Sequence, residues 1–187
     1  MMRIISGSFR GKKIYQPTNN KTRPLKDLVK ESIFNIINHS KKFKIHLENA
    51  NILDMFSGVG SFGIECLSRG VQEVVFVENY HGVIPILKKN LLNLKSVDNY
   101  KIIEKDIYNN NKIINLNIQF DIIFLDPPFK DKNLSIIFRK IKNENLLKEN
   151  GIIILHRHKD EKDIFLEDFN IIEEKKYGIS RIFFFSN

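Results

Sequence analysis

The sequence predicts an α/β fold in which helices cover both faces of a doubly wound, mostly parallel sheet. Short, continuously apolar segments alternate with segments of helical periodicity between residue 50 and residue 156. A glycine-rich loop follows the first of these apolar segments. Strands without polar alternation are typical of a parallel sheet buried on both faces, so these observations favour a Rossmann-like architecture.

The N-terminal quarter predicts a hairpin followed by a helix. Residues 2–16, MRIISGSFRGKKIYQ, contain two short strand-like segments around a Gly-Ser-Phe-Arg-Gly turn. Residues 17–24 have turn composition, and apolar residues then recur at helical spacing from Leu25 to about Asn38. We expect this helix to dock one face on the core before a polar, basic link over 39–49.

Strands and helices alternate along the rest of the chain. Strands are predicted at residues 50–56, 73–78, 100–106, 120–126 and 151–156. Helices are predicted at residues 60–70, 80–94 and 132–148, with a short helical piece before the strand at 120. The tail has strand composition on both sides of Tyr177-Gly178 and predicts a closing antiparallel hairpin.

Composition indicates one globular domain in a reducing compartment. The chain has 187 residues, of which 42% are hydrophobic and 28% are charged. No apolar run approaches 18 residues, and the N-terminus lacks the features of a signal peptide, so we expect a cytoplasmic protein without a membrane span. The lone Cys66 excludes an internal disulfide framework and predicts core packing, and no cluster of metal ligands is apparent.

The excess positive charge is confined to the first 48 residues. They hold eleven Lys and Arg against three acids, a net charge of +8, whereas basic and acidic residues balance in the remainder. A basic end on a neutral body indicates a binding surface for a polyanion. The alternative is a solvated basic face without a partner.

The stretch ILDMFSGVGSFGIE places Gly58, Gly60 and Gly63 in a GxGxxG pattern between a strand and a helix. Such a loop lets the backbone approach a ligand closely. Glu78 ends the next strand, 20 residues after Gly58, where its carboxylate can bind both hydroxyls of a ribose. The pattern therefore predicts a site for a nucleoside-containing cofactor.

Asp54, just before the glycine loop, argues against a dinucleotide. A carboxylate ~4 Å from a pyrophosphate costs about 4 kcal/mol at an effective dielectric constant of about 20. S-adenosylmethionine carries an ammonium and a sulfonium and has no phosphate, so it suits this acid. The alternative role of Asp54 is a helix cap or a loop hydrogen bond. Asp106 could likewise accept the adenine amino hydrogen, with Ile107 packed on the ring, or could be an ordinary helix cap.

The next strand ends in Asp126-Pro127-Pro128-Phe129, which are the candidate catalytic residues. The prolines stiffen the turn and remove backbone donors, which leaves carbonyl oxygens and a carboxylate as rigid acceptors. Two such acceptors can orient an exocyclic amino group of a base toward a methyl donor. Phe129 offers a stacking face for a base that has left its stack.

Two histidines, His156 and His158, end the strand GIIILHRH. Their spacing could suit a shared metal, but a third ligand is not apparent. We expect edge residues or weak phosphate contacts.

The residues together resemble a known family. The sequences LDMFSGVGSFG and DPPF are similar to those of amino-group methyltransferases that use S-adenosylmethionine, and RIISGSFRGKKI with TRPLKDLVKESIFNII is similar to the bacterial 16S rRNA guanine-N2 methyltransferases. The resemblance implies a class I methyltransferase with a seven-stranded sheet and an antiparallel last strand. It also implies that residues 1–48 form an RNA-binding extension and residues 49–187 the catalytic domain.

The same resemblance assigns roles to individual residues. Asp126 and Pro127 would hold the guanine amino group. The cofactor would contact Asp54, Phe56, Gly58, Gly60, Gly63, Glu78, Asn79, Asp106 and Ile107. The RNA would contact Arg3, Arg10, Lys12, Lys13, Arg23, Lys26 and Lys30. The implied partner is 16S rRNA within the small ribosomal subunit or an assembly intermediate, bound by a monomer.

Four other functions remain open on the sequence. A DNA adenine-N6 methyltransferase shares DPPF but usually has a sequence-reading domain. A protein-glutamine methyltransferase would not need the basic end. An NAD-dependent oxidoreductase is opposed by Asp54, and the last alternative is a catalytically silent RNA-binding module.

Overall fold

In the computed structural model, residues 2–17, 25–109, 112–114, 117–161, 163, 165 and 169–187 are described. The strands in these residues are β1 (Asn51–Met55), β2 (Glu73–Glu78), β3 (Tyr100–Glu104), β4 (Phe120–Leu125), β5 (Leu147–His158), β6 (Asn170–Tyr177) and β7 (Ser180–Ser186). The helices are α1 (Asp27–His39), α2 (Ser61–Ser68), α3 (Ile84–Leu92) and α4 (Leu134–Asn143).

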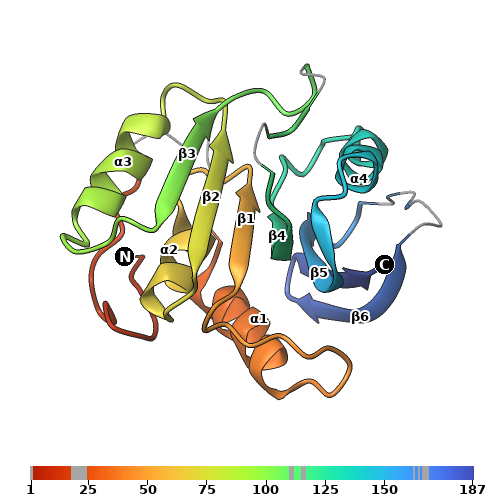
Figure 1. Cartoon of the computed structure of the whole chain (residues 1–187), viewed down its shortest axis with the longest axis horizontal. Helices are drawn as coiled ribbons and strands as arrows, with labels where there is room; N and C mark the ends of the chain where they lie inside the picture. The colour runs from red at the N-terminus through yellow and green to blue at the C-terminus, as the bar shows by residue number, and fades with distance from the viewer. Residues whose placement is uncertain are drawn as a thin grey trace.

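The strands form a single sheet with the order β3-β2-β1-β4-β5-β7-β6 (Figure 1). Strands β1 to β5 pair in parallel, and β7 lies antiparallel between β5 and β6. This confirms the predicted fold class. Because the chain continues to opposite sides of β1, toward β2 and later toward β4, a crevice is expected at the carboxyl ends of β1 and β4.

Each face of the sheet is buried by a different set of elements. One hydrophobic core joins alternate strand residues such as Ile52, Phe76 and Phe124 to apolar side chains of α1, α2 and α3. The other core joins the intervening residues, such as Leu53 and Leu125, to α4 and to the chain after β3. Alternate side chains of a strand point to opposite faces, so strands buried on both sides must be apolar throughout.

The N-terminal segment forms the predicted hairpin and packs on the sheet domain. Its two arms meet at the antiparallel bridge Arg3–Lys13, and three backbone hydrogen bonds of 2.9 to 3.0 Å join residues 2–4 to residues 11–14. The start of its turn is bound to α2, because Glu65 accepts hydrogen bonds from the amides of Ile5 and Ser6 at 2.8 and 2.9 Å. Met2, Ile4 and Ile14 also belong to the same core as α1 and the sheet, so the described residues before 49 share one core with those after it.

Two helix predictions need correction. The helix predicted over 132–148 ends at Asn143, because Asn145 adopts a φ of 49° and Leu147 already pairs with Phe120 in the sheet. The short helical piece before β4 is absent from its described residues, 107–109, 112–114 and 117–119. Side chains of the neighbouring helix hold this segment, since the Lys140 ammonium donates to the Ile107 and Tyr108 carbonyls at 2.6 and 3.1 Å.

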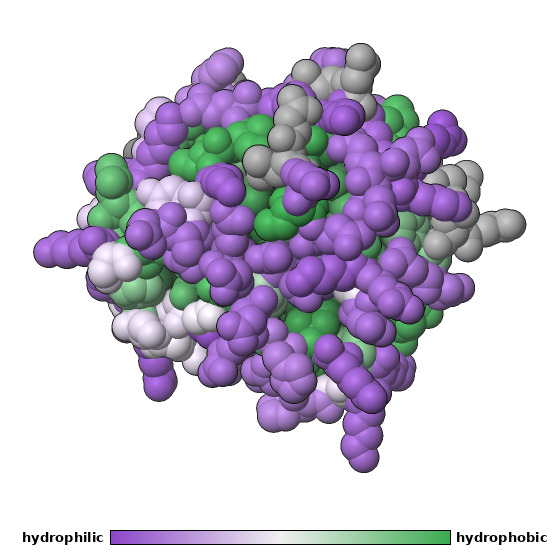
Figure 2. Space-filling view, in the orientation of Figure 1, coloured by the Kyte–Doolittle hydropathy of each residue, from purple (hydrophilic) through white to green (hydrophobic). Residues whose placement is uncertain are grey.

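The surface is dominated by hydrophilic side chains. Figure 2 shows purple residues over most of one face, with apolar patches between them. Across the described ranges, none of the helices combines the length and the apolar character needed to span a bilayer.

Candidate active site

A cleft with a volume of about 1140 Å³ opens at the carboxyl ends of β1, β2 and β4. Asp54, Glu78 and Asp126 all line it, so the structure brings the three predicted acids into one cavity. Further predicted residues that line it are Phe56, Gly58, Asn79, Pro127, Pro128 and Phe129. With Asp27, these carboxylates outnumber the two lysines that also line the cleft, Lys26 and Lys130.

Glu78 is fixed by backbone amides. Its Oε2 accepts the Gly58 N–H at 2.7 Å, and its Oε1 accepts the N–H groups of Asn79 and Tyr80 at 2.9 and 2.8 Å. Each carboxylate oxygen can accept more than one hydrogen bond. Glu78 therefore links the glycine loop to the end of β2 and retains capacity for a ligand hydroxyl.

Asp54 is almost fully buried, with 1% of its surface exposed, and its Oδ2 accepts the Gly63 N–H at 2.9 Å. This bond satisfies one of the amides at the start of α2, so the alternative role of Asp54 as a helix cap is also realised. Burial raises the pKa of the Asp54 carboxyl well above its usual range, the Gly63 N–H opposes this, and the charges of Asp126 and Glu78 raise it further. A cation bound in the cleft would favour the ionised form.

Two glycines shape the loop without lining the cleft. Gly60 has a φ of 82°, in the left-handed region that side chains disfavour. A Cβ on Gly63 would lie 2.3 Å from the Phe76 ring, so glycine lets α2 pack against β2. The GxGxxG spacing thus has a separate physical reason at each position.

A smaller cavity of about 140 Å³ adjoins the cleft and is lined by Asp106 and Ile107. Phe56, Glu78 and Asn79 line both cavities, so the two are neighbours. Asp106 accepts the Tyr108 N–H at 2.8 Å and a hydrogen of the Asn109 amide at 2.7 Å, which makes it a turn residue. The alternative of a helix cap does not hold, because the described residues after it form a bend.

The backbone of the DPPF turn is bound by Arg157, a residue that was not among the predicted site residues. The Arg157 side chain is fully buried and donates to the Pro128 and Asp131 carbonyls at 3.0 and 2.9 Å. Its other donors form a two-point ion pair with Asp163, at 2.8 Å for both contacts. An arginine inside the apolar strand GIIILHRH was the signal, because a buried charge requires partners.

The expectation for His156 was wrong. This side chain is 6% exposed, its Nδ1 lies 2.8 Å from Asp126 Oδ1, and its Nε2 lies 2.8 Å from Ser180 Oγ. His158 is only half-buried and, like His156, lies near the Phe129 ring, with 5.2 Å between ring centroids. Cys66 is buried, as predicted.

Lys30 needs correction as an RNA contact, because its side chain is fully buried. Its Nζ donates to the Arg3 carbonyl at 3.1 Å and lies 3.5 Å from the buried Glu65 carboxylate. Burial lowers the pKa of Lys30, and the charge of Glu65 opposes that shift. Lys30 therefore anchors the N-terminal segment to α1 and α2.

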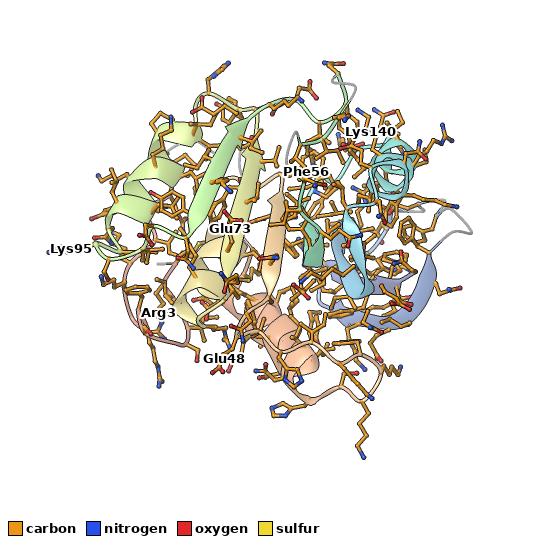
Figure 3. The ribbon with its side chains drawn as sticks, in the orientation of Figure 1. Arg3, Glu48, Phe56, Glu73, Lys95 and Lys140 are labelled. Atoms are coloured by element: carbon orange, nitrogen blue, oxygen red, sulfur yellow. The ribbon has the colours of Figure 1, made fainter. Side chains whose placement is uncertain are left out.

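The other predicted RNA contacts are distributed along the N-terminal segment. Arg3, Arg10, Lys13 and Lys26 are exposed. Lys12 is half-buried and donates to the Asn93 carbonyl at 3.2 Å, while Arg23 lies outside the described residues. In Figure 3, Arg3 lies at the lower left of the view and Phe56 near its middle, so Arg3 is separated from the end of β1. Lys26 lines the cleft itself.

The comparisons with known proteins agree with this fold. The model of the protein family described as Conserved hypothetical protein 95 matches residues 2–186. This chain belongs to that family. Together with the named relatives that follow, this match confirms the family resemblance seen in the sequence.

Two relatives of this member of the Conserved hypothetical protein 95 family are named Ribosomal RNA small subunit methyltransferase D. That of Haemophilus influenzae is 34% identical over 95% of this chain and 90% of its own length. That of Buchnera aphidicola subsp. Baizongia pistaciae is 32% identical over 97% of this chain and 88% of its own length. Among solved structures, HI0767 of Haemophilus influenzae has a TM-score of 0.74 and 31% identity and covers 100% of this chain and 98% of that chain.

Proposed function

We propose that this protein is an S-adenosylmethionine-dependent methyltransferase that methylates the N2 amino group of a guanine in 16S rRNA. The observation that carries the proposal is the convergence of Asp54, Glu78 and Asp126 on one cleft that the DPPF turn also lines. The names of the two relatives, which are small-subunit rRNA methyltransferases, support the class of reaction and of substrate.

The cleft residues fit the cofactor. S-adenosylmethionine supplies a methyl group on a positively charged sulfonium. A buried carboxylate such as Asp54 is stabilised in its ionised form by a nearby cation. The buried Ser61 hydroxyl, which also lines the cleft, finds no hydrogen-bond partner among the described residues and can bond to a ligand. Glu78 and Asp106 offer acceptors for the ribose and the adenine amino group.

The DPPF turn suits an exocyclic amino group. Its nitrogen carries two hydrogens, which the Asp126 carboxylate and the Pro127 carbonyl can accept. These bonds would orient the nitrogen toward the methyl group that the sulfonium of the cofactor would supply, with the sulfur leaving as a neutral thioether. The methylated nitrogen then releases a proton to Asp126 or to water. Phe129 stacks on the extruded base.

The basic residues of the N-terminal segment provide the RNA-binding surface. Arg10, Lys13 and Lys26 are exposed, and Lys26 lines the cleft, so a phosphate bound at Lys26 would lie beside the site. This surface favours RNA over the alternative of a protein substrate, which would not need it.

Calorimetric titration tests the cofactor, and nucleoside analysis tests the product. We expect S-adenosylmethionine to bind with a 1:1 stoichiometry and NAD not to bind. Small-subunit particles, naked 16S rRNA and duplex DNA are then compared as acceptors of a labelled methyl group. Binding of NAD in place of S-adenosylmethionine, or methylation of adenine in DNA, would contradict the proposal.

A further inference from the structure

We infer that His156 is a positioning residue which, held in turn by Ser180, fixes the Asp126 carboxylate for amino-group binding. This inference deepens the proposed function and rests on it. Neither residue belongs to the DPPF turn, and neither is among the residues that the family resemblance assigns to the site.

The sheet topology builds this contact. Asp126 directly follows β4, His156 lies near the end of β5, and Ser180 begins β7. Because β5 pairs with β4 on one side and with β7 on the other, a side chain of β5 can bridge the two neighbouring strand ends. The imidazole does so with distances of 2.8 Å on both sides, from Nδ1 to Asp126 and from Nε2 to Ser180.

The two partners define the tautomer of the imidazole. An ionised carboxylate can only accept, so the His156 Nδ1 must carry the hydrogen that Asp126 Oδ1 accepts. In a neutral imidazole Nε2 is then the acceptor, and Ser180 donates its hydroxyl hydrogen to it. Ser180 thereby holds the ring in the orientation that presents Nδ1–H to Asp126.

This bond makes the two oxygens of Asp126 unequal. Oδ1 already accepts from His156, whereas the described residues place no hydrogen bond on Oδ2, so Oδ2 keeps its full capacity for the amino hydrogen of a base. The same imidazole also meets the Phe129 ring edge to face, with 5.5 Å between centroids. His156 thus contacts both side chains that the proposed mechanism uses to orient the base.

His156 and Ser180 are enclosed, with only 6% and 5% of their surfaces exposed. A buried hydrogen bond of this kind survives solvent competition, whereas a partner left unpaired is costly. Residues that orient metal ligands by such hydrogen bonds change activity by about 10- to 100-fold when they are replaced, and we expect an effect of this order for the orientation of Asp126.

Three variants separate positioning from simple packing. His156→Leu removes both hydrogen bonds and retains an apolar side chain, His156→Asn places an amide donor near the position of Nδ1, and Ser180→Ala removes only the outer bond. The readouts are kcat, the KM for RNA, and the Kd for S-adenosylmethionine by calorimetry. We expect His156→Leu to lower kcat about 100-fold while the cofactor Kd changes less than about twofold. His156→Asn should recover most of the activity, and Ser180→Ala should fall between them.

Two kinetic outcomes would overturn the inference. One is a wild-type kcat in His156→Leu. The other is an equal loss of activity in His156→Asn and His156→Leu, which would indicate packing alone.

Nitrogen NMR on protein labelled with ¹⁵N-histidine gives a readout that needs no activity. The chain has five histidines. We expect the imidazole signal that is missing in His156→Asn to be that of an Nδ1–H tautomer in the wild type and to change in Asp126→Ala. An Nε2–H tautomer at His156 would overturn the inference. If the wild type transferred no methyl group, the proposed function would fail, yet this measurement would still decide the Asp126–His156 contact.

Discussion

The carboxylate of Asp54 accepts a hydrogen bond from the amide of Gly63, nine residues later, at 2.9 Å. The acid before the glycine loop is therefore fixed by the helix that follows the loop. This places a buried carboxylate, together with Glu78 and Asp126, in a cleft whose electrostatics favour a cation. The methyl donor proposed for this cleft is cationic, so these carboxylates would attract it.

Replacing Asp54 by Asn should stabilise the ligand-free protein and weaken its cofactor binding. The folded state raises the pKa of Asp54, so it holds the proton more tightly than the unfolded chain. Ionisation of Asp54 therefore costs folding stability as the pH rises above the unfolded value of ~4. We expect the gain in melting temperature of Asp54→Asn over the wild type to be larger at pH 8 than at pH 5.

The same variant should bind S-adenosylmethionine at least about tenfold more weakly, a loss of about 1.4 kcal/mol. Calorimetry measures this, with Asp98→Asn, an exposed acid, as the control. Unchanged affinity in Asp54→Asn would contradict the electrostatic role.

Replacing Arg157 by Met should destabilise the protein and disorder the DPPF turn. The substitution leaves the Asp163 carboxylate and the Pro128 and Asp131 carbonyls without the hydrogen bonds of Arg157. Removing one member of a buried ion pair costs about 3–5 kcal/mol of stability. Arg157→Lys should recover only part of the loss, because an ammonium cannot fork between Pro128, Asp131 and Asp163. Urea denaturation measures the difference, with the exposed Arg139→Met as the control. Wild-type stability in Arg157→Met would show that the turn does not depend on this contact.

Replacing Lys30 by Met should lower stability without changing RNA binding. Lys30 is buried against Glu65. In the variant, Glu65 would lose this cation and keep its contacts with Arg69 and with backbone amides such as that of Ile5. We expect a loss of about 3 kcal/mol in the free energy of unfolding, whereas the exposed Lys26→Met should change it little. If RNA binding became less dependent on salt while the stability stayed unchanged, Lys30 would contact RNA and would not be a structural residue.

Neutralising Arg10 and Lys13 together should flatten the salt dependence of RNA binding. Each phosphate contact with single-stranded RNA contributes about 0.7 to the slope of log K against log salt, so the pair should lower its magnitude by about 1.4. The matched control is Lys175→Gln with Lys176→Gln, on β6. Fluorescence anisotropy at several salt concentrations gives both slopes. Equal slopes for the two double variants would show that the RNA does not bind at Arg10 and Lys13.

The sequence predicted the sheet and the acids of the site because both depend on local pattern. Continuous apolar segments identify strands that are buried on both faces, and acids at the ends of parallel strands converge at one edge. Asp54, Glu78 and Asp126 were located in this way. The same alternation predicted a mostly parallel sheet, whereas the order of its strands is known only from the structure.

Contacts between residues far apart in the chain could not be predicted from the sequence. Lys30 looks like an exposed base of a helix, and the packing of α1 against α2, where the Phe34 and Phe62 rings stack, brings Glu65 to it. His156 looked like a strand edge, because the chain does not disclose that β7 inserts beside β5 and covers it. In both cases the partner lies 24 or more residues away, beyond the reach of periodicity.

The central claim is that the acceptors of the DPPF turn orient a guanine amino group beside the cationic methyl donor. Its most direct test is nucleoside analysis of 16S rRNA incubated with labelled S-adenosylmethionine and either the wild type or Asp126→Ala. The control is Asp121→Asn, near the start of the same strand. We predict labelled N2-methylguanosine from the wild type and the control, and none from Asp126→Ala, whose cofactor affinity stays near that of the wild type. Label in another nucleoside, or undiminished transfer by Asp126→Ala, would contradict it.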